Sequence, residues 1–355
     1  MMAGTSRRTN TLLVIRMSAL GDVAMTVPVI YSFARQYPDW HIKVLTQPFF
    51  SRLFLDKPDN VSFIMADPKG RHKGPAGLFR LIRDTHKEHV TAVADMHNVL
   101  RSWAVDISFI LTGKKVRIVR KKRRERKRLT SLRHKRLVRQ RNFIDRYFDV
   151  LSSLGLPASR QFSSLFPDST PSENDVPHIG IAPFARYTTK TYPPEMMEKA
   201  AAMLAGKGYR VLLFGGKGNE AEELEKWESA HPGIKSVAGK LTIDKELELM
   251  SRLDLMVSMD SANMHLSSLA GTRVISVWGG TTVHCGFLGW RQKEEDAICA
   301  GLQCQPCSIA GKPECPLGHM NCLRSISPEE ICNKITETIH QRNSRPLAQQ
   351  PFGIR

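Results

Sequence analysis

Runs of apolar residues alternate with helix-like patterns through the N-terminal half of the chain. The apolar runs predict five strands, at 11–16, 42–46, 61–65, 90–95 and 116–119. The pattern from Val23 to Gln36 predicts a helix between the first two strands, and the pattern from Asn142 to Leu154 predicts another that ends before Gly155. Strands alternating with helices are typical of a parallel sheet covered by helices.

The same alternation restarts in the C-terminal half. Strands are predicted at 178–182, 209–214, 255–259 and 273–278, and helices at 194–206, 219–230, 244–252 and 261–270. We therefore expect an α/β protein of two Rossmann-like domains that face each other across a cleft. Such a cleft suits two substrates, because ligands bind at the carboxyl ends of parallel strands.

Changes in composition set the expected domain boundaries. Residues 161–177 are rich in Ser, Pro and Asp and lack periodicity, so we interpret them as a linker. The expected domains are residues 1–160 and 178–342, and residues 343–355 are expected to be a flexible tail.

The positive charge of the chain is concentrated in one segment. Residues 114–141 contain sixteen Lys or Arg residues and one acid, Glu125, so they supply +15 of the net charge of +18. We assign this segment to the N-terminal domain. A segment of this kind attracts polyanions, namely nucleic acid, anionic lipid head groups or a phosphorylated glycolipid.

The lack of long apolar segments and the number of cysteines indicate in which cellular compartment the protein is found. No stretch is apolar enough for a transmembrane helix, and Met1–Asn10 lacks the apolar core of a secretory signal. We therefore expect a cytoplasmic protein. Because disulfides are rare in that compartment, the seven cysteines indicate a metal site, a reduced thiol cluster or chance.

The first motif is Arg16–Asp22, at the carboxyl end of the first predicted strand. Gly21 permits a tight turn, and Ser18 and Gly21 are candidate acceptor contacts. Asp22 is then expected near a helix N-terminus, where a carboxylate is able to serve as general base toward an acceptor hydroxyl. The pattern by itself favours the alternative that Asp22 only caps the helix.

The second motif lies at the end of the strand at 255–259, where a helix begins. Unpaired N–H groups at a helix start form an anion site, and the small Ser261 and Ala262 allow a diphosphate to come close. Asp260 is suited to accept hydrogen bonds from sugar hydroxyls. The alternatives are a plain helix cap and, for His265, a packing role.

Two loops in the C-terminal half add weaker candidates. Thr188, Thr189 and Lys190 follow a strand and are suited to bind phosphate oxygens. Gly215 and Gly216 form a Gly-rich turn after another strand, which matches neither a P-loop nor a complete dinucleotide motif. Both loops also have an ordinary interpretation as exposed polar turns.

Two further groups complete the candidates. Asp95, His97, Asn98 and Arg101 follow a strand of the N-terminal half and are candidate acceptor contacts; the alternative is an ordinary polar loop with a helix cap. Four cysteines have the spacing C-x2-C-x7-C-x6-C, which permits a structural zinc site or a reduced thiol cluster, with His319 as a substitute ligand; they are Cys304, Cys307, Cys315 and Cys322.

Together, these segments resemble the ADP-heptose:lipopolysaccharide heptosyltransferase family, glycosyltransferase family 9. The resemblance runs from about Leu12 to Ile339, and five segments carry it, 16–22, 95–98, 260–266, 304–307 and 315–319. It implies a GT-B fold and an inverting transfer of heptose from ADP-heptose to the lipopolysaccharide inner core, without a catalytic metal. It also changes the preferred interpretation of Asp22 from helix cap to catalytic base.

The resemblance assigns the donor contacts as well. Lys190 and the neighbouring threonines would contact the donor phosphates, and Asp260 would contact the donor sugar. The diphosphate would lie against Ser261, Ala262 and Asn263, with His265 holding the turn. The chain departs from the expected pattern at Asn263, which is bulky, and in its long basic segment.

The basic segment gains an expected role from this resemblance. It would hold the enzyme at the cytoplasmic face of the inner membrane, where an anionic glycolipid acceptor is displayed. Two alternatives stay open at this point. One is a transferase of the same fold that uses another nucleotide sugar. The other is a zinc-containing nucleic-acid-binding protein, against which the basic segment has no interleaved aromatic residues.

Overall fold

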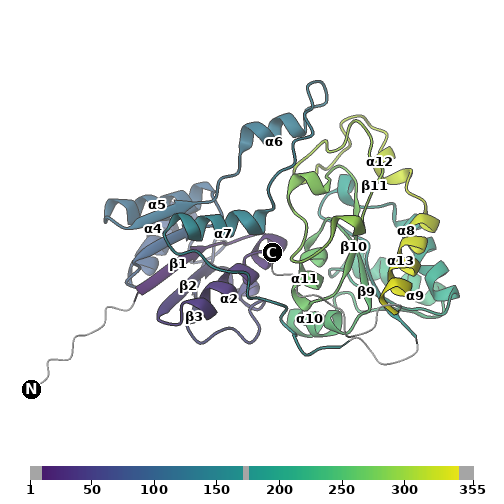
Figure 1. Ribbon diagram of the computed structural model, residues 1–355, viewed down its shortest axis with the longest axis horizontal. Helices are drawn as coiled ribbons and strands as arrows, with labels where there is room; N and C mark the ends of the chain where they lie inside the picture. Colours follow the sequence, from purple (N-terminus) through teal and green to yellow (C-terminus); the bar gives the residue numbers. More distant parts are fainter. Residues whose placement is uncertain (1–9, 171–175, 344–355) are drawn as a thin grey trace, which may run out of the picture. The chain divides into compact units, whose positions relative to one another are not determined.

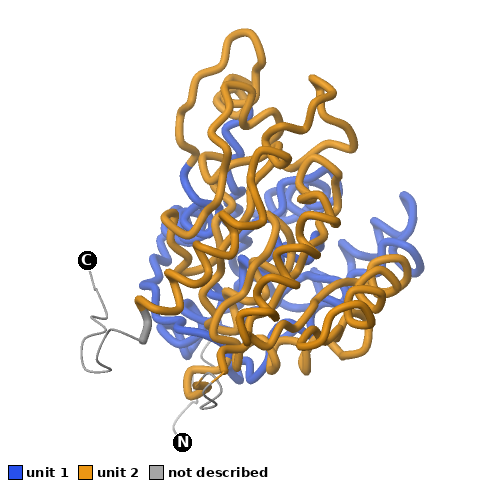
Figure 2. Tube along the Cα trace, turned by 90° about the vertical axis from the view of Figure 1, so that its right-hand side faces the viewer, with its two compact units in different colours: residues 1–123, 141–165 blue, residues 124–140, 166–355 orange. Residues whose placement is uncertain are grey.

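A computed structural model describes residues 10–170 and 176–343, which form two compact α/β units (Figure 1). Unit 1 takes in the chain up to Arg123 together with Arg141–Leu165, and unit 2 takes in Arg124–Gln140 and the chain from Phe166 (Figure 2). In the described ranges, no helix is both long and apolar enough to cross a bilayer. Residues 171–175 of the expected linker and the expected tail from 344 onward lie outside the described residues.

Unit 1 is built on a five-stranded parallel sheet in the order β3-β2-β1-β4-β5. Its elements are β1 (Asn10–Ile15), α1 (Leu20–Ala24), α2 (Val27–Gln36), β2 (Trp40–Thr46), α3 (Pro48–Ser51), β3 (Val61–Met65), α4 (Gly74–His86), β4 (Ala92–Asp95), α5 (Leu100–Leu111), β5 (Lys115–Ile118) and α7 (Phe143–Ser153).

Alternation along β1 divides the core of unit 1 between the two faces of the sheet. Leu13 and Ile15 belong to a buried cluster with Val105 and Phe109 of α5 and Leu81 of α4. Successive side chains of a strand point to opposite faces, so the intervening apolar residues of β1 face the other layer. Helices α2 and α7 pack together in that layer. Burial on both faces explains the continuous apolar runs from which the strands were predicted.

Unit 2 contains a six-stranded parallel sheet in the order β11-β10-β9-β6-β7-β8. Its strands are β6 (His178–Ala182), β7 (Arg210–Leu213), β8 (Ile234–Ser236), β9 (Leu255–Met259), β10 (Val274–Trp278) and β11 (Ala297–Cys299). Its helices are α6 (Arg123–Leu129), α8 (Pro194–Gly206), α9 (Asn219–Ala230), α10 (Ile243–Ser251), α11 (Ala262–Ala270), α12 (Asn321–Arg324) and α13 (Pro328–Asn343), with short 3-10 turns η1 (Thr188–Lys190), η2 (Val283–Cys285) and η3 (Glu294–Asp296).

The strands predicted from the sequence all form, within two residues at each end. The helix predicted from Val23 to Gln36 is instead two helices, α1 and α2. The chain turns between them at Thr26, whose hydroxyl donates to the carbonyl of Val23 at 2.7 Å, and Pro28 occupies the first turn of α2. The pattern missed β8 and β11, which have only three residues each. It also missed six helices, namely α3, α4, α5, α6, α12 and α13.

The basic segment differs from its expected place in the N-terminal domain. Residues 124–140 pack with unit 2, which also contains the segments predicted to bind the donor. Lys135 Nζ donates to the carbonyls of Cys304 and Pro306 at 2.8 and 2.7 Å, the N–H of buried Gln140 donates to the carbonyl of His284, and Leu129 is fully buried. These contacts hold the segment on unit 2. Its charge pattern alone could not predict this placement, because the pattern does not show which tertiary contacts form.

Candidate active site

In each sheet the strand order reverses at one point, and the candidate motifs lie there. The reversal falls between β1 and β4 in unit 1 and between β6 and β9 in unit 2. Ligands of open parallel sheets bind at the carboxyl ends of the strands beside such a reversal. The loops after β1 and β4 are therefore the candidate binding edge of unit 1, and those after β6 and β9 are the candidate binding edge of unit 2.

Asp22 lies in the first turn of α1, directly after β1. The N-cap residue of this helix is Ala19, so Asp22 is not the N-cap, although its Oδ2 accepts a hydrogen bond from the Ala19 N–H at 3.3 Å. The same oxygen lies 2.7 Å from Nη2 of Arg16, and 29% of the Asp22 side chain is exposed. The structure thus gives this edge an accessible carboxylate next to a fixed positive charge.

Arg16 is the buried partner that holds Asp22. Its Nη1 donates to the carbonyl of Met96 at 2.7 Å and to the hydroxyl of Tyr147 at 3.3 Å. Burial lowers the pKa of Arg16, but Tyr147 and Asp22 raise it further, so the net pKa lies above its ordinary value. A guanidinium held in this way stabilises the charge and the orientation of the carboxylate above it.

The loop after β4 contacts the loop after β1 through a histidine. Nε2 of His97 lies 3.3 Å from the hydroxyl oxygen of Ser18. Burial, together with the charges of Arg16 and Lys121, lowers the pKa of His97 to about 3. His97 is therefore neutral at physiological pH and acts as a hydrogen-bonding group beside Asp22.

Asp95 lies beneath this loop rather than at its surface. It is fully buried, and its carboxylate accepts hydrogen bonds from the N–H groups of His97 and Asn98 and from the hydroxyl of Ser102, at 2.6 to 2.9 Å. Its expected role as an acceptor contact does not fit this burial. Asp95 holds the turn that presents His97.

Asn98 and Arg101 also contribute to the loop itself. Asn98 adopts a φ of 55°, donates from Nδ2 to the carbonyl of Val119 and accepts from Trp103 Nε1. Half-buried Arg101 donates to the carbonyl of His72 at 2.6 Å. Gly21 lies within α1 next to Asp22. Of the expected acceptor residues, the structure brings Ser18, Gly21 and His97 to the edge occupied by Asp22.

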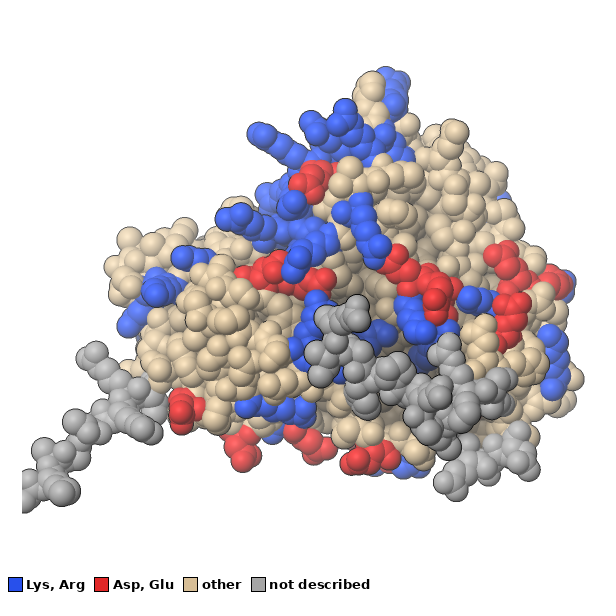
Figure 3. Space-filling view, in the orientation of Figure 1, with Lys and Arg blue, Asp and Glu red and all other residues tan. Residues whose placement is uncertain are grey.

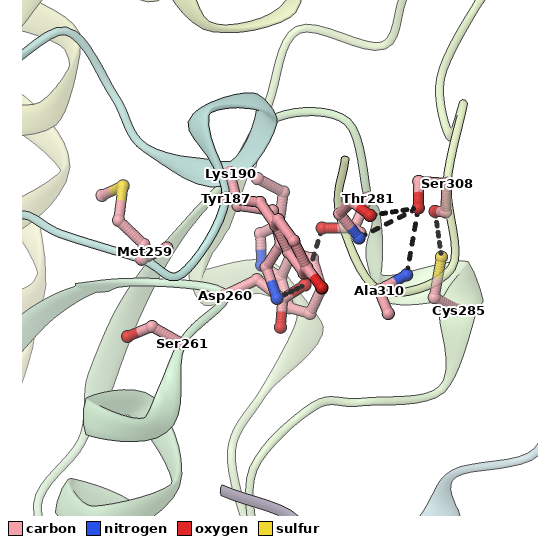
Figure 4. Close-up of polar contacts among 12 residues, drawn as sticks. Tyr187, Lys190, Met259, Asp260, Ser261, Thr281, Cys285, Ser308 and Ala310 are labelled. Carbon is pink, nitrogen blue, oxygen red and sulfur yellow. Dashed lines mark hydrogen bonds and ion pairs between the residues drawn. The ribbon is translucent and has the colours of Figure 1, made fainter. Parts of the chain in front are cut away.

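In unit 2, Lys190 and Asp260 form the centre of the candidate site (Figure 4). Lys190 Nζ lies 2.9 Å from Oδ2 of Asp260, and the two side chains are only 14% and 5% exposed. Thr281 Oγ1 donates to the same carboxylate oxygen at 2.6 Å. The loop after β6 and the end of β9 are thus joined by a buried ion pair.

The start of α11 lies directly after Asp260. Ser261 is its N-cap residue, with no side-chain hydrogen bond to the helix start, and Ser261, Ala262 and Asn263 are half-buried while the residues after them are buried. His265 is buried in this helix. The start of α11 is therefore the accessible part of this helix, and the N–H groups of a first helical turn are the ones able to bind an anion.

The remaining candidates for donor binding, in the loops after β6 and β7, differ in how exposed they are. Thr188 is exposed, but Thr189 is buried, with its hydroxyl bonded to the carbonyl and N–H of Lys312 at 2.8 Å each. Gly216 donates its N–H to Glu220 at 2.6 Å, and Gly215 packs against Leu224. Thr189 therefore ties two loops together, which leaves Thr188 as the accessible hydroxyl of this pair.

Comparison with known proteins decides the family. The family model "Glycosyltransferase family 9 (heptosyltransferase)" matches residues 78–317, about two thirds of the chain. The chain belongs to glycosyltransferase family 9. It is similar to the lipooligosaccharide heptosyltransferase 2 of Campylobacter jejuni, at 22% identity over 89% of this chain and 95% of that protein.

The fold of this chain is similar to those of solved family 9 structures. The family 9 glycosyl transferase of Veillonella parvula superposes with a TM-score of 0.69 at 18% identity, covering 94% of this chain and 98% of that one. The Escherichia coli heptosyltransferase WaaC, with ADP-2-deoxy-2-fluoro heptose, gives 0.66 at 16% identity, covering 92% and 99%. This family 9 glycosyltransferase therefore has a GT-B fold of two parallel-sheet α/β units, as the sequence predicted.

The sequence missed one loop of this glycosyltransferase's site, Gly279–Thr281, which follows β10. The Gly280 N–H donates to the carbonyl of Thr189 at 2.6 Å, and a Cβ atom at Gly279 would lie 2.5 Å from that carbonyl oxygen. Thr281 then reaches Asp260. The Gly-Gly pair at the carboxyl end of a strand was the available signal, since glycine permits such close backbone approach.

Gly311 likewise permits a close approach of the backbone, in this case to the side chain of Lys190. It has a φ of +95°, and a Cβ atom there would lie 2.7 Å from both Lys190 Cδ and Tyr187 Cδ2. The loop that carries Gly311 is held by the Ser308 hydroxyl, which accepts from the N–H groups of Ala310 and Gly311 (Figure 4). The loop after Cys307 thus covers the aliphatic part of Lys190.

Two of the four spaced cysteines, Cys304 and Cys307, precede this covering loop, and the other two, Cys315 and Cys322, follow it. Burial raises the pKa of Cys307 and raises that of Cys322 to about 12, so both remain neutral thiols. Cys315 differs: burial raises its pKa, but backbone N–H groups around its sulfur lower it further. Throughout residues 10–170 and 176–343, no three or more His, Cys, Asp or Glu side chains are grouped to hold a metal ion. The zinc site stays a prediction from spacing, without support from this arrangement.

Proposed function

We propose that this glycosyltransferase transfers heptose from ADP-heptose to the inner core of lipopolysaccharide with inversion at the anomeric carbon. The observation that carries the proposal is Asp22, a partly exposed carboxylate fixed by buried Arg16 at the strand reversal of unit 1. The names of relatives support the sugar and the acceptor, because these relatives are described as lipopolysaccharide or lipooligosaccharide heptosyltransferases and one is described with an ADP-heptose analogue.

The donor would bind at the edge of unit 2. Its diphosphate would lie against the first turn of α11 and accept hydrogen bonds from the N–H groups there. Lys190 would meet the negative charge that develops on the departing diphosphate, and Asp260 would accept hydrogen bonds from the sugar hydroxyls. The existing Lys190–Asp260 pair holds both side chains in place before the donor arrives.

The reaction would be a single displacement. An acceptor hydroxyl oxygen forms a bond to the anomeric carbon while the bond from that carbon to the donor phosphate oxygen breaks. Asp22 takes the hydroxyl proton, and ADP leaves. Neutral His97, beside Ser18, would help orient the acceptor hydroxyl.

A thermal-shift screen of nucleotide sugars tests the donor assignment. ADP-heptose at about 100 times its Kd should stabilise the enzyme by about 2.7 kcal/mol, which corresponds to a rise in Tm of about 4 °C for a chain of this length. UDP- and GDP-sugars should give no comparable shift. A larger shift with one of them would replace ADP-heptose with another nucleotide sugar, which is the alternative donor.

We further propose that the basic segment holds the enzyme at the cytoplasmic face of the inner membrane, next to its glycolipid acceptor. Figure 3 shows Lys and Arg side chains gathered over the part of the surface where Figure 1 draws α6. Arg124, Lys127, Arg128, Arg133 and Arg136 are exposed there, on a segment anchored by Lys135. Each such cation near an anionic surface contributes about 1 kcal/mol.

Sedimentation with phosphatidylglycerol vesicles tests this docking. Arg124→Gln/Arg133→Gln should lower vesicle affinity about 30-fold at low salt, because two cations are lost, and the difference should shrink at high salt. Lys207→Gln/Arg210→Gln removes two exposed cations elsewhere on unit 2 and is the matched control. Equal affinity of the two double variants would refute the role of the segment.

A further inference from the structure

Helix α5 of unit 1 exposes an apolar stripe opposite its buried face. Leu100 and Leu111 are each 80% exposed, and Ile107 and Ile110 are 56% and 54% exposed. On an ideal helix, positions 100, 107 and 111 fall within about 40° of one another. The opposite side of the helix, with Val105 and Phe109, fills the core of unit 1.

The inner face of α5 packs against the core of unit 1, and its apolar outer face is expected to be buried against a second partner. A surface helix of a monomeric protein normally places polar residues on its outer face, and contiguous exposed apolar patches mark interaction sites. No described element of unit 1 covers the stripe. Phe79, on the adjacent helix α4, is a further exposed apolar residue, at 73%.

The exposed charges around the stripe are basic, and the one acidic residue of α4, Asp84, is half-buried and paired with Arg71. Between His97 and Arg124 the only acidic residue is Asp106, which is 1% exposed and belongs to the buried face of α5. Lys114, Lys115 and Arg117 follow the helix and are exposed, and α4 adds exposed Arg80 and Arg83. Figure 3 shows the left of the molecule, where Figure 1 draws α4 and α5, as largely uncharged surface with Lys and Arg among and beside it. An apolar stripe with basic neighbours and no exposed acid is complementary to an anionic lipid surface.

We propose that α5 is an interfacial helix that inserts its Leu100–Leu111 stripe into the head-group region of an anionic bilayer. Its twelve residues extend about 18 Å, too short to cross the hydrocarbon core of about 30 Å, so the helix lies in the plane of the membrane. This role of α5 rests on the proposed membrane-displayed acceptor. It adds an apolar contact with the bilayer to the electrostatic contact proposed for the basic segment.

The position of α5 in unit 1 explains what this contact would achieve. The helix begins at Leu100, immediately after the loop in which Asp95 presents His97. An inserted Leu100 would therefore bring the candidate acceptor edge of unit 1 to the head-group level. A soluble enzyme needs this approach if the acceptor hydroxyl belongs to a membrane-anchored glycolipid.

Vesicle binding in high salt separates apolar insertion from charge attraction. In about 0.5 M NaCl the Debye length is only about 4 Å, so attraction between exposed charges is largely screened. Wild-type enzyme should still bind vesicles of equal parts phosphatidylcholine and phosphatidylglycerol. Leu100→Ser/Leu111→Ser should bind them about 30-fold or more weakly at both low and high salt. Leu241→Ser/Leu317→Ser, two exposed leucines of unit 2, is the matched control and should bind as wild type.

The fluorescence of Trp103 measures the insertion of α5 into the bilayer directly. This residue is half-buried on the same side of α5, and its indole N–H is bonded to Asn98. Lipids brominated near the head group should quench its emission in the wild-type enzyme, and Trp103→Phe should remove the quenched component. The leucine variant should lose the quenching as well.

Three results would overturn the inference. They are wild-type vesicle affinity of the leucine variant, absence of quenching at Trp103, and a dimer in light scattering that the leucine variant abolishes while vesicle binding is unchanged. The last would show that a second copy covers the stripe. Transfer to a water-soluble acceptor oligosaccharide tests the proposed function separately, because it requires no membrane and should proceed normally in the leucine variant.

Discussion

Asp22→Asn should reduce heptosyl transfer by about 10²- to 10⁴-fold, because a positioned general base contributes about that much to proton transfer. The amide oxygen of Asn still accepts hydrogen bonds from Arg16 and Ala19, so the fold should persist. Steady-state turnover at saturating donor and acceptor measures the effect. The loss should appear in kcat, since the proton moves only in the transition state.

Two controls isolate the role of Asp22 as base. The variant should keep the Tm rise that the donor causes, because the proposed donor contacts lie in unit 2. Asp149→Asn removes an exposed carboxylate of unit 1, paired with Arg141, and should leave turnover unchanged. Near-wild-type turnover of Asp22→Asn would exclude this residue as the base.

Lys190→Met should both destabilise the enzyme and remove its response to the donor. The substitution leaves the Asp260 carboxylate buried without its cation, which costs about 3–5 kcal/mol in comparable buried pairs. The Thr281 hydrogen bond to Asp260 remains and offsets part of this cost. Thermal unfolding should show a Tm lower by several degrees, and ADP-heptose should no longer raise it.

A double variant distinguishes the lost charge from lost packing. Lys190→Met/Asp260→Asn removes both charges and should regain part of the stability without regaining donor binding. Lys199→Met is the matched control: it breaks an exposed pair with Glu329 and should change stability by about 1 kcal/mol or less. A normal donor response in Lys190→Met would exclude Lys190 from the phosphate site.

The sequence predicted the sheets better than the helices around them, for a physical reason. Strands buried on both faces are continuous apolar runs, as in β1 and β9, and such runs are visible without knowledge of the fold. Helix α5 was missed because it is apolar on both sides, which hides the period of an amphipathic helix. The three-residue strands β8 and β11 are too short to give any periodicity.

The candidate site was predictable where its residues follow a strand in sequence. Asp22, Lys190 and Asp260 each lie in the segment after a predicted strand, and the parallel order of the strands brings such segments to one edge of each sheet. The burial of Asp95 and of Thr189 was not predictable, because it depends on hydrogen bonds to Ser102 and to the distant Lys312. The packing of the basic segment on unit 2 depends on tertiary contacts of the same kind.

Product analysis with wild-type and Asp22→Asn enzymes side by side tests the proposed inverting heptosyl transfer and the role of Asp22 as its base. Each enzyme is incubated with ADP-heptose and a heptose-deficient inner-core acceptor, and the product is examined by mass spectrometry and NMR. We expect the wild-type enzyme to add one heptose, with the anomeric configuration opposite to that of the donor, and Asp22→Asn to make almost none. Retention of configuration, or equal product from both enzymes, would contradict this expectation.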